Sequence, residues 1–183
     1  MSDIAIFGVL GAGQMGSGIA QVAAGAGWTV KLADASLDRA TAARDKIASG
    51  LRKLVEKGKV GADEAGALVG RIVPVGSIEE LGDADLVVEA VTEHLDTKLA
   101  LFEKLDAAVK PGAVLASNTS SISLTRIAAA TRRPADVVGL HFFNPVPMMR
   151  LVEIVRALQT SDETYQRALT AVQLFLEPTG VAA

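Results

Sequence analysis

Residues 4–16, Ile-Ala-Ile-Phe-Gly-Val-Leu-Gly-Ala-Gly-Gln-Met-Gly, form the stretch that decides the fold. The nearly unbroken apolar run at residues 4–10 is typical of a strand covered on both faces of a sheet. The glycines that follow have the G-x-G-x-x-G spacing, and the small and apolar residues after them favour a helix. A strand, a glycine-rich turn and a helix in this order predict the first part of a β-α-β unit.

Strand and helix patterns alternate along the rest of the chain. We expect further strands at residues 28–34, 71–75, 85–90, 113–116, 137–142 and 151–155, and helices at 13–26, 36–58, 63–69, 97–109 and 161–176, with another starting near Leu124. This alternation predicts an α/β fold, a Rossmann-like, doubly wound and mainly parallel sheet with a helical hairpin insertion around residues 51–60. The link at residues 144–147 is too short for a parallel crossover, so the C-terminal strand should be antiparallel.

Length and composition set further limits. The chain has 183 residues, half of them hydrophobic and about a fifth charged, as expected for one packed α/β domain. A formal net charge of -3 with dispersed basic residues argues against nucleic acid as a partner.

The absence of cysteine and of targeting segments bears on the cellular compartment and on metal binding. There is no cysteine, so neither a disulfide framework nor a sulfur metal site is expected, and no metal is predicted. A reducing compartment fits, and cytoplasm is the expected location. Residues 1–3 lack the basic start of a signal peptide, and no apolar stretch is long enough to predict a membrane span.

The glycine-rich turn predicts a dinucleotide site. Its glycines permit a tight turn, close approach of the backbone to a pyrophosphate, and tight helix packing. The expected cofactor contacts in the turn are Gly11, Gly13, Gln14, Met15 and Gly16. Asp34 follows at the end of the next strand, where a carboxylate accepts hydrogen bonds from ribose hydroxyls and repels a 2′-phosphate. NAD is therefore expected rather than NADP; the alternative is a packing turn with a surface aspartate.

The chain contains two histidines, whose side chains exchange protons readily near neutral pH. His94 lies in a charged stretch at an expected helix start, where a solvated surface residue is the better interpretation. His141 lies near the end of an apolar strand, beside Phe142 and Phe143, which is where open α/β sheets place reactive groups. A hydrogen-bonded core histidine is the alternative interpretation of His141.

Glu153 strengthens the case for chemistry at His141. It is the single charge within residues 151–155, and antiparallel pairing would bring it opposite His141. We expect a buried carboxylate there, which needs a partner and would in turn orient the imidazole and stabilise its protonated form. A purely structural ion pair is the less favoured interpretation.

A polar segment, residues 117–121, follows another strand end, so its hydroxyls and amide are expected to face the same crevice. A polar turn that caps the helix near Leu124 explains the segment equally well.

With these residues in place, the sequence from Ile4 to Gln173 resembles the NAD-binding N-terminal domain of the 3-hydroxyacyl-CoA dehydrogenase family, and within it the bacterial 3-hydroxybutyryl-CoA dehydrogenases. The resemblance is carried by four motifs: residues 11–20 (Gly-Ala-Gly-Gln-Met-Gly-Ser-Gly-Ile-Ala), 88–93 (Val-Glu-Ala-Val-Thr-Glu), 117–121 (Ser-Asn-Thr-Ser-Ser) and 141–147 (His-Phe-Phe-Asn-Pro-Val-Pro).

The resemblance implies roles for individual residues. Glu93 and Lys98 would contact the nicotinamide-ribose side of NAD, and Asn118 would also belong to the cofactor site. Ser120 and Asn144 would line the site around the substrate's 3-hydroxyl group and the nicotinamide. His141 would be the general acid/base and Glu153 its orienting carboxylate, in the reversible oxidation of an L-3-hydroxyacyl-CoA to the 3-ketoacyl-CoA, a step of fatty acid β-oxidation.

The resemblance also implies an acyl-CoA substrate near the helical hairpin. Of the basic residues there, we assign a CoA phosphate contact only to Lys57, because a lysine-rich helix is usually just a solvated face. Gly50 stands where many relatives have a serine beside CoA, so one expected polar contact is missing.

The end of the sequence departs from the family. Relatives continue into a helical domain that closes over the acyl group and forms the usual homodimer, and residues 176–181 fit the interdomain segment poorly. We expect residues 1–183 to be the NAD-binding domain alone, without that C-terminal domain, and to turn over poorly. The alternatives are an NAD-binding module without catalysis, another oxidoreductase acting on small 3-hydroxy acids, and a pure interaction protein.

Overall fold

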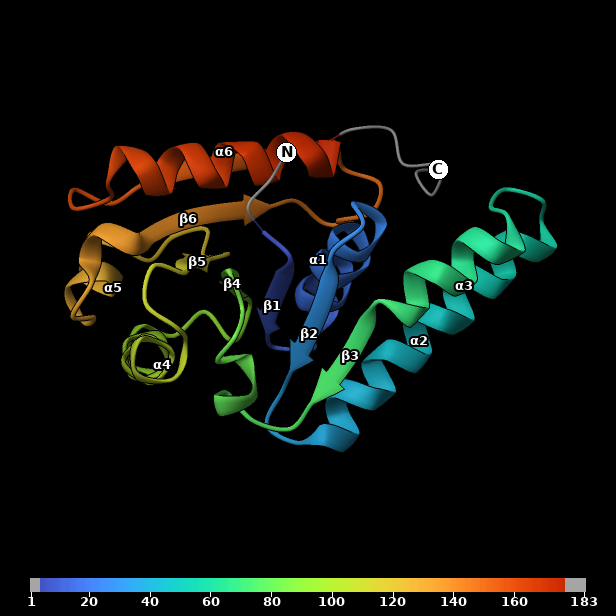
Figure 1. Ribbon diagram of the computed structural model, residues 1–183, viewed down its shortest axis with the longest axis horizontal. Coiled ribbons are helices and arrows are strands. Elements are labelled where there is room, and N and C mark those ends of the chain that lie inside the picture. Colours follow the sequence, from blue (N-terminus) through green and yellow to red (C-terminus); the bar gives the residue numbers. More distant parts are fainter. Residues whose placement is uncertain (1–3, 177–183) are drawn as a thin grey trace.

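The computed structural model describes residues 4–176 and shows a seven-stranded sheet with helices on both faces (Figure 1). The strand order is β3-β2-β1-β4-β5-β6-β7. The strands are β1 (Ile6–Leu10), β2 (Thr29–Ala33), β3 (Ile72–Val75), β4 (Leu86–Glu89), β5 (Val114–Ser117), β6 (Val137–Phe142) and β7 (Val152–Arg156). The helices are α1 (Gln14–Gly25), α2 (Leu37–Glu56), α3 (Ala62–Gly70), α4 (Leu95–Ala108), α5 (Leu124–Ala129) and α6 (Asp162–Leu176).

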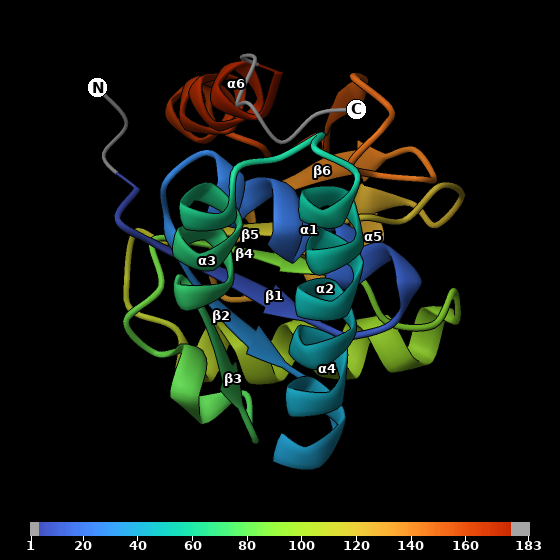
Figure 2. The same cartoon turned by 90° about the vertical axis from the view of Figure 1, so that its right-hand side faces the viewer.

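This architecture confirms the expected mainly parallel sheet. Neighbouring strands from β3 to β6 pair in parallel, and only the pairing of β6 with β7 is antiparallel among the described residues. The predicted hairpin is formed by α2 and α3, which pack against each other beside the β3 edge (Figure 2). The expectations for residues 1–3 and 177–181 lie outside the described residues.

The two faces of the sheet bury separate apolar clusters because successive side chains of a strand point to opposite faces. In β1, Phe7 and Val9 pack on the side of α1, α3 and α6, whereas Leu10 packs on the side of α4 and α5. Strands buried on both faces explain why these segments read as continuous apolar runs rather than alternating ones.

Element bounds differ from expectation by a residue or two at most ends. Strand β7 begins at Val152 rather than at residue 151, and α4 begins at Leu95 because His94 caps it, its ring accepting a hydrogen bond from the Thr97 N–H. Ser36 caps α2 as a helix-capping serine does, accepting from the Arg39 N–H. Short 3₁₀ turns at Glu79–Leu81 and Pro134–Asp136 were not expected.

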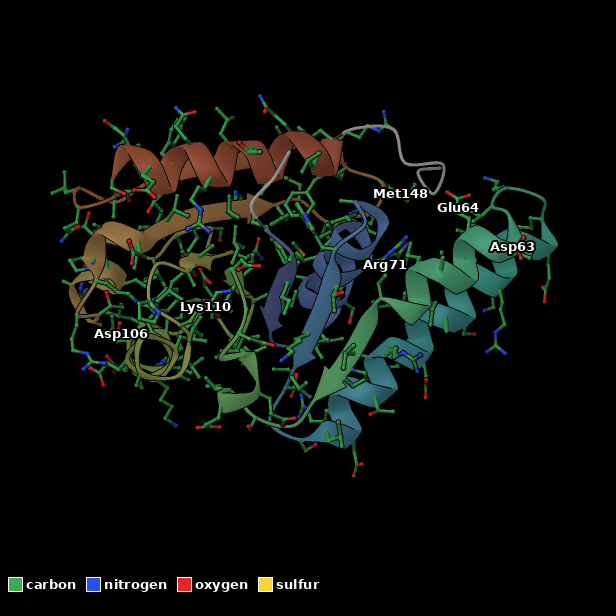
Figure 3. The ribbon with its side chains drawn as sticks, viewed as in Figure 1. Asp63, Glu64, Arg71, Asp106, Lys110 and Met148 are labelled. Atoms are coloured by element: carbon green, nitrogen blue, oxygen red, sulfur yellow. The ribbon has the colours of Figure 1, made fainter. Side chains whose placement is uncertain are left out.

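Ion pairs fasten α4 to its surroundings on one side of the sheet. Asp106 accepts hydrogen bonds from Arg132 and Arg133 in the connection after α5, and Lys110 pairs with Asp85 before β4. Figure 3 shows Asp106 and Lys110 near α4. Burial tends to raise the pKa of the Asp106 carboxyl, but these donors and charges hold it below its ordinary value. Helix α4 is thereby fixed against the sheet, and with it the side chains that α4 contributes to the site.

Candidate active site

The site lies where the sheet changes direction. From β1 the chain winds outward through β2 and β3, and then returns to β4, on the other side of β1, and winds outward again. The carboxyl ends of β1 and β4 therefore lie next to each other with their connections diverging, which is where open α/β sheets bind ligands.

The glycine-rich turn connects β1 to α1 at this point. Gly11 has φ of 102°, a value that side chains rarely adopt, and its N–H donates to the Ala33 carbonyl at 2.8 Å. A Cβ on Gly16 would lie 1.7 Å from the Gly11 carbonyl oxygen, so α1 can pass the turn only with glycine there. At Gly13 a Cβ would meet nothing within 4 Å, which leaves open space directly in front of the helix N-terminus.

The two glycines predict two different mutant phenotypes. Gly16→Ala should destabilise the protein by about 1–3 kcal/mol, because a methyl group is forced into backbone. Gly13→Ala should leave the melting temperature unchanged but weaken NADH binding by about tenfold, equivalent to ~1.4 kcal/mol, because the methyl occupies space needed by the pyrophosphate. Thermal melts and NADH fluorescence titrations of both variants check this. Equal effects of both changes on stability would contradict it.

Asp34 stands just beyond β2 and faces the same turn. One carboxylate oxygen accepts from the Ala12 N–H at 2.7 Å and the other from the Ala35 N–H at 2.8 Å. The second oxygen also receives the Arg39 Nε at 2.7 Å. Asp34 lines a cavity together with Gly11, Gly13 and Arg39. The Asp34 carboxylate fits the adenosine ribose of a dinucleotide. The open space at Gly13 and the N-terminus of α1 fit its pyrophosphate.

A second cavity is lined by three of the four expected catalytic residues, His141, Ser120 and Asn144, but not by Glu153. It is lined by Met15, Ala90, Val91, Glu93, Lys98, Asn118, Ser120, His141, Phe142, Phe143 and Asn144. These side chains come from α1, α4 and the ends of β4, β5 and β6. Their convergence brings together the motifs that are more than 100 residues apart in the sequence.

His141 and Glu153 are directly opposite each other in the β6–β7 register. The His141 Nδ1 lies 2.8 Å from a Glu153 carboxylate oxygen, which leaves Nε2 as the other ring nitrogen. The expectation that Glu153 is buried was wrong: its side chain is 54% exposed, against 22% for His141. The reason is that β7 is the edge strand of the sheet, with a neighbour on one side only.

Polar contacts join the glycine-rich turn to the end of β6. The Gln14 side-chain amide donates to the Asn144 side-chain oxygen at 3.1 Å. The Asn118 side-chain oxygen accepts from the Phe142 N–H at 2.8 Å, and the Asn118 N–H donates to the Glu89 carbonyl at 2.9 Å. Asn118, which directly follows β5, thus links the ends of β4 and β6, the two strands that flank β5, while it lines the cavity.

Glu93 organises the polar segment that follows β5. One of its oxygens accepts from the N–H groups of Ser120 and Ser121, at 3.1 and 3.2 Å, and from the Thr119 hydroxyl. Burial raises the pKa of the Glu93 carboxyl, but the hydrogen bond from Thr119, the charge of Lys98 and further donors outweigh it and hold the pKa below its ordinary value. The carboxylate therefore stays ionised at neutral pH.

The segment does not cap α5 in the way the alternative interpretation required. The residue at that cap is Ser123, whose side chain makes no capping hydrogen bond. The segment instead hydrogen bonds to two acidic side chains: Ser117 donates to Glu89, the last residue of β4, and Ser120 donates to Glu93 in the loop that follows.

Glu89 belongs to the motif at residues 88–93, but no role was predicted for it from the sequence. It is fully buried, and the Lys98 Nζ lies 2.7 and 2.8 Å from its two oxygens. Ser117 Oγ and the Val91 N–H donate to it as well, each at 2.7 Å. Lys98 is only 1% exposed although it lines the cavity, and its Nζ also lies 3.6 Å from Glu93. The sequence signal for the Glu89–Lys98 pair was the single charged residue, Glu89, at the end of the apolar strand β4.

The structure leaves other candidates outside the cavity. Lys57 is the exposed residue at the C-terminal cap of α2, and it is not among the cavity-lining residues. A Cβ on Gly50 would point into open space, so no local packing demands glycine there. In the described part of the chain, no cluster of three potential metal-binding side chains occurs, and no helix is long and apolar enough to cross a membrane.

The fold and the site define a class of protein: a Rossmann-type, dinucleotide-binding domain. The family model described as "3-hydroxyacyl-CoA dehydrogenase, NAD binding domain" matches residues 6–179. The chain belongs to this family, and its cofactor is NAD.

Individual relatives agree with the family model. The chain is 49% identical to a probable 3-hydroxybutyryl-CoA dehydrogenase of Deinococcus radiodurans, over 86% of this chain and 56% of the relative. It is 47% identical to the corresponding probable enzyme of Bacillus subtilis, over 85% and 54%. A crystal structure of 3-hydroxybutyryl-CoA dehydrogenase from Escherichia coli K12 superposes with a TM-score of 0.92 at 42% identity, covering 94% of this chain and 37% of that one. The chain thus spans about half the length of the curated relatives it matches.

Proposed function

We propose that this chain carries the NAD site and the acid/base residues of a 3-hydroxyacyl-CoA dehydrogenase, which interconverts an L-3-hydroxyacyl-CoA and the 3-ketoacyl-CoA. The observation that carries the proposal is the 2.8 Å contact between Glu153 and His141, whose ring lines a cavity that adjoins the glycine-rich turn. An imidazole with an acidic partner at the reactive end of a dinucleotide site is the arrangement that alcohol oxidation needs.

In the proposed mechanism, His141 removes the proton of the 3-hydroxyl group at Nε2. Glu153 accepts a hydrogen bond from Nδ1–H, which fixes the ring tautomer and stabilises the imidazolium that forms. The chemistry that NAD supplies when bound is acceptance of a hydride from C3. In the reverse direction, His141 returns the proton to the carbonyl oxygen.

Ser120 and Asn144 are proposed to position the substrate oxygen beside His141. Both line the cavity, and the Ser120 backbone is anchored to Glu93, so its hydroxyl is held on a fixed turn. Glu93 and Lys98, which line the same cavity, are proposed to contact the nicotinamide-ribose end of NAD. Lys57 is proposed to contact a CoA phosphate outside the cavity.

The specific alternative is an NAD-binding module with little or no catalytic activity. The exposure of Glu153 on an edge strand favours it, since solvent weakens the electrostatic support that a carboxylate gives to an imidazolium. The assignment of residues 1–183 to one NAD-binding domain, homodimerisation of the whole enzyme, and a cytoplasmic location remain predictions.

Two measurements on one sample test the proposal. NADH binding is followed by fluorescence, and turnover by the oxidation of NADH that depends on acetoacetyl-CoA. Binding together with turnover supports the dehydrogenase, and binding without turnover supports the module. A well-folded sample that does not bind NADH contradicts both.

A further inference from the structure

We propose that Arg39 is a second determinant of cofactor choice: it provides a binding position for a 2′-phosphate that the charge of Asp34 keeps closed. Selection against NADP would then come from the Asp34 carboxylate, while Arg39 already provides the cation that an NADP site needs. The inference rests on binding of the adenosine end of the cofactor beside Asp34, and it does not depend on catalytic activity.

The geometry of the pair supports this. Asp34 lies just before the N-cap of α2, and Arg39 lies in the first turn of that helix. The Arg39 Nε is 2.7 Å from an Asp34 oxygen, and both residues line the cavity of the glycine-rich turn. The carboxylate is 11% exposed and the guanidinium side chain 70% exposed, so Arg39 is the outer member of the pair.

The hydrogen bonds around Asp34 show what restrains Arg39. The carboxylate already receives the N–H groups of Ala12 and Ala35, which fix it between the glycine-rich turn and the start of α2. Among the described residues, Asp34 is the one ion-pair partner of the Arg39 guanidinium, and the pairing offsets its charge. A dinucleotide that lacks the 2′-phosphate adds only hydroxyl donors, which a carboxylate accepts readily.

A 2′-phosphate reverses the balance. It brings nearly two negative charges next to Asp34, and this repulsion opposes binding. If the residue at position 34 is neutral, the Arg39 guanidinium is left beside the ribose without its counter-charge. Its planar set of N–H donors matches phosphate oxygens in pairs. An arginine at this place in a Rossmann site is a known way to accommodate NADP.

The experiment compares NADH and NADPH binding by fluorescence in a short series of variants. Asp34→Asn removes the charge but keeps a side-chain oxygen for the Ala12 N–H. We expect NADH binding to weaken by about tenfold, from loss of a charged hydrogen bond, and NADPH binding to strengthen by about tenfold. Adding Arg39→Ala to Asp34→Asn should abolish the gain in NADPH binding.

Arg52→Ala is the matched control. Arg52 lies on the same helix about 20 Å further along its axis, and its removal changes the net charge equally. Added to Asp34→Asn, it should leave the gain in NADPH binding within about threefold, since exposed charges at that distance are screened. Thermal melts of each variant establish that binding is measured on folded protein.

The outcomes separate the inference from the function on which it rests. Equal NADPH affinity of Asp34→Asn with and without Arg39→Ala overturns the role of Arg39. Failure of the unmodified chain to bind NADH contradicts the cofactor site itself. If Asp34→Asn does not fold, Arg39→Ala alone decides: it should weaken the residual NADPH binding by about threefold or more relative to NADH, and an unchanged ratio overturns the inference.

Discussion

A His141→Gln variant should lose about 10²- to 10⁴-fold in the rate of acetoacetyl-CoA-dependent NADH oxidation, the usual contribution of a positioned acid/base group. Glutamine keeps a polar side chain of similar reach but cannot take up a proton near neutral pH. NADH binding should change little, because His141 lies at the proposed reactive end of the site and, within residues 4–176, its ring hydrogen bonds to Glu153 and not to the glycine-rich turn. The rate is measured with saturating NADH, and binding by fluorescence.

Two further variants sharpen this test. Glu153→Gln should reduce the rate less than His141→Gln does, because the base remains and only its exposed partner is altered. His94→Gln, which changes the other histidine, should leave the rate unchanged, since His94 caps α4 outside the cavity. A His141→Gln protein with the original rate would remove the imidazole from the mechanism.

Lys98→Met should destabilise the protein by about 3–5 kcal/mol, because it leaves the carboxylate of Glu89 buried without its counter-ion. Both side chains are almost completely buried, and the ammonium lies within hydrogen-bond distance of both Glu89 oxygens. Denaturant unfolding followed by circular dichroism measures the loss. Lys31→Met, which breaks the partly exposed pair with Asp83, should cost less than about 1 kcal/mol.

The double variant Glu89→Gln, Lys98→Met separates folding from cofactor binding. The glutamine oxygen can still accept from the Val91 N–H, and its amide nitrogen, in place of the other carboxylate oxygen, can donate to the Ser117 hydroxyl, so no charge is left buried. Stability should therefore recover most of the loss seen in Lys98→Met. NADH affinity should stay below that of the unmodified protein, because the double variant still lacks the Lys98 cation, which lines the cavity. A double variant as unstable as the single one would show that charge compensation is not what Glu89 and Lys98 contribute.

Much of the fold followed from sequence because local pattern and topology agreed. Apolar runs located the strands, and glycine spacing located the first turn. The short link at residues 144–147 predicted an antiparallel pair, and the observed register places His141 opposite Glu153. The meeting of the motifs at residues 11–20, 117–121 and 141–147 in one region could therefore be predicted without knowledge of side-chain positions.

Other features depend on packing that residue patterns do not encode. The Glu89–Lys98 pair joins a strand end to a helix nine residues later, and its burial depends on how α4 lies against the sheet. Glu153 was expected to be buried because it interrupts an apolar run, but its exposure depends on whether another strand lies beyond β7. The interaction of Glu93 with residues 119–121 likewise required the spatial adjacency of β4 and β5.

The position of β7 at the rim of the sheet separates two levels of cooperativity. Strands β1 and β4 each have neighbours on both sides, whereas within residues 4–176 the one strand that pairs with β7 is β6. Peripheral strands open in sub-global fluctuations that cost less free energy than complete unfolding. Detachment of residues 152–156 would separate Glu153 from His141 while leaving the glycine-rich turn intact, so we expect the proposed proton-transfer pair to be thermally more labile than the nucleotide pocket beside it.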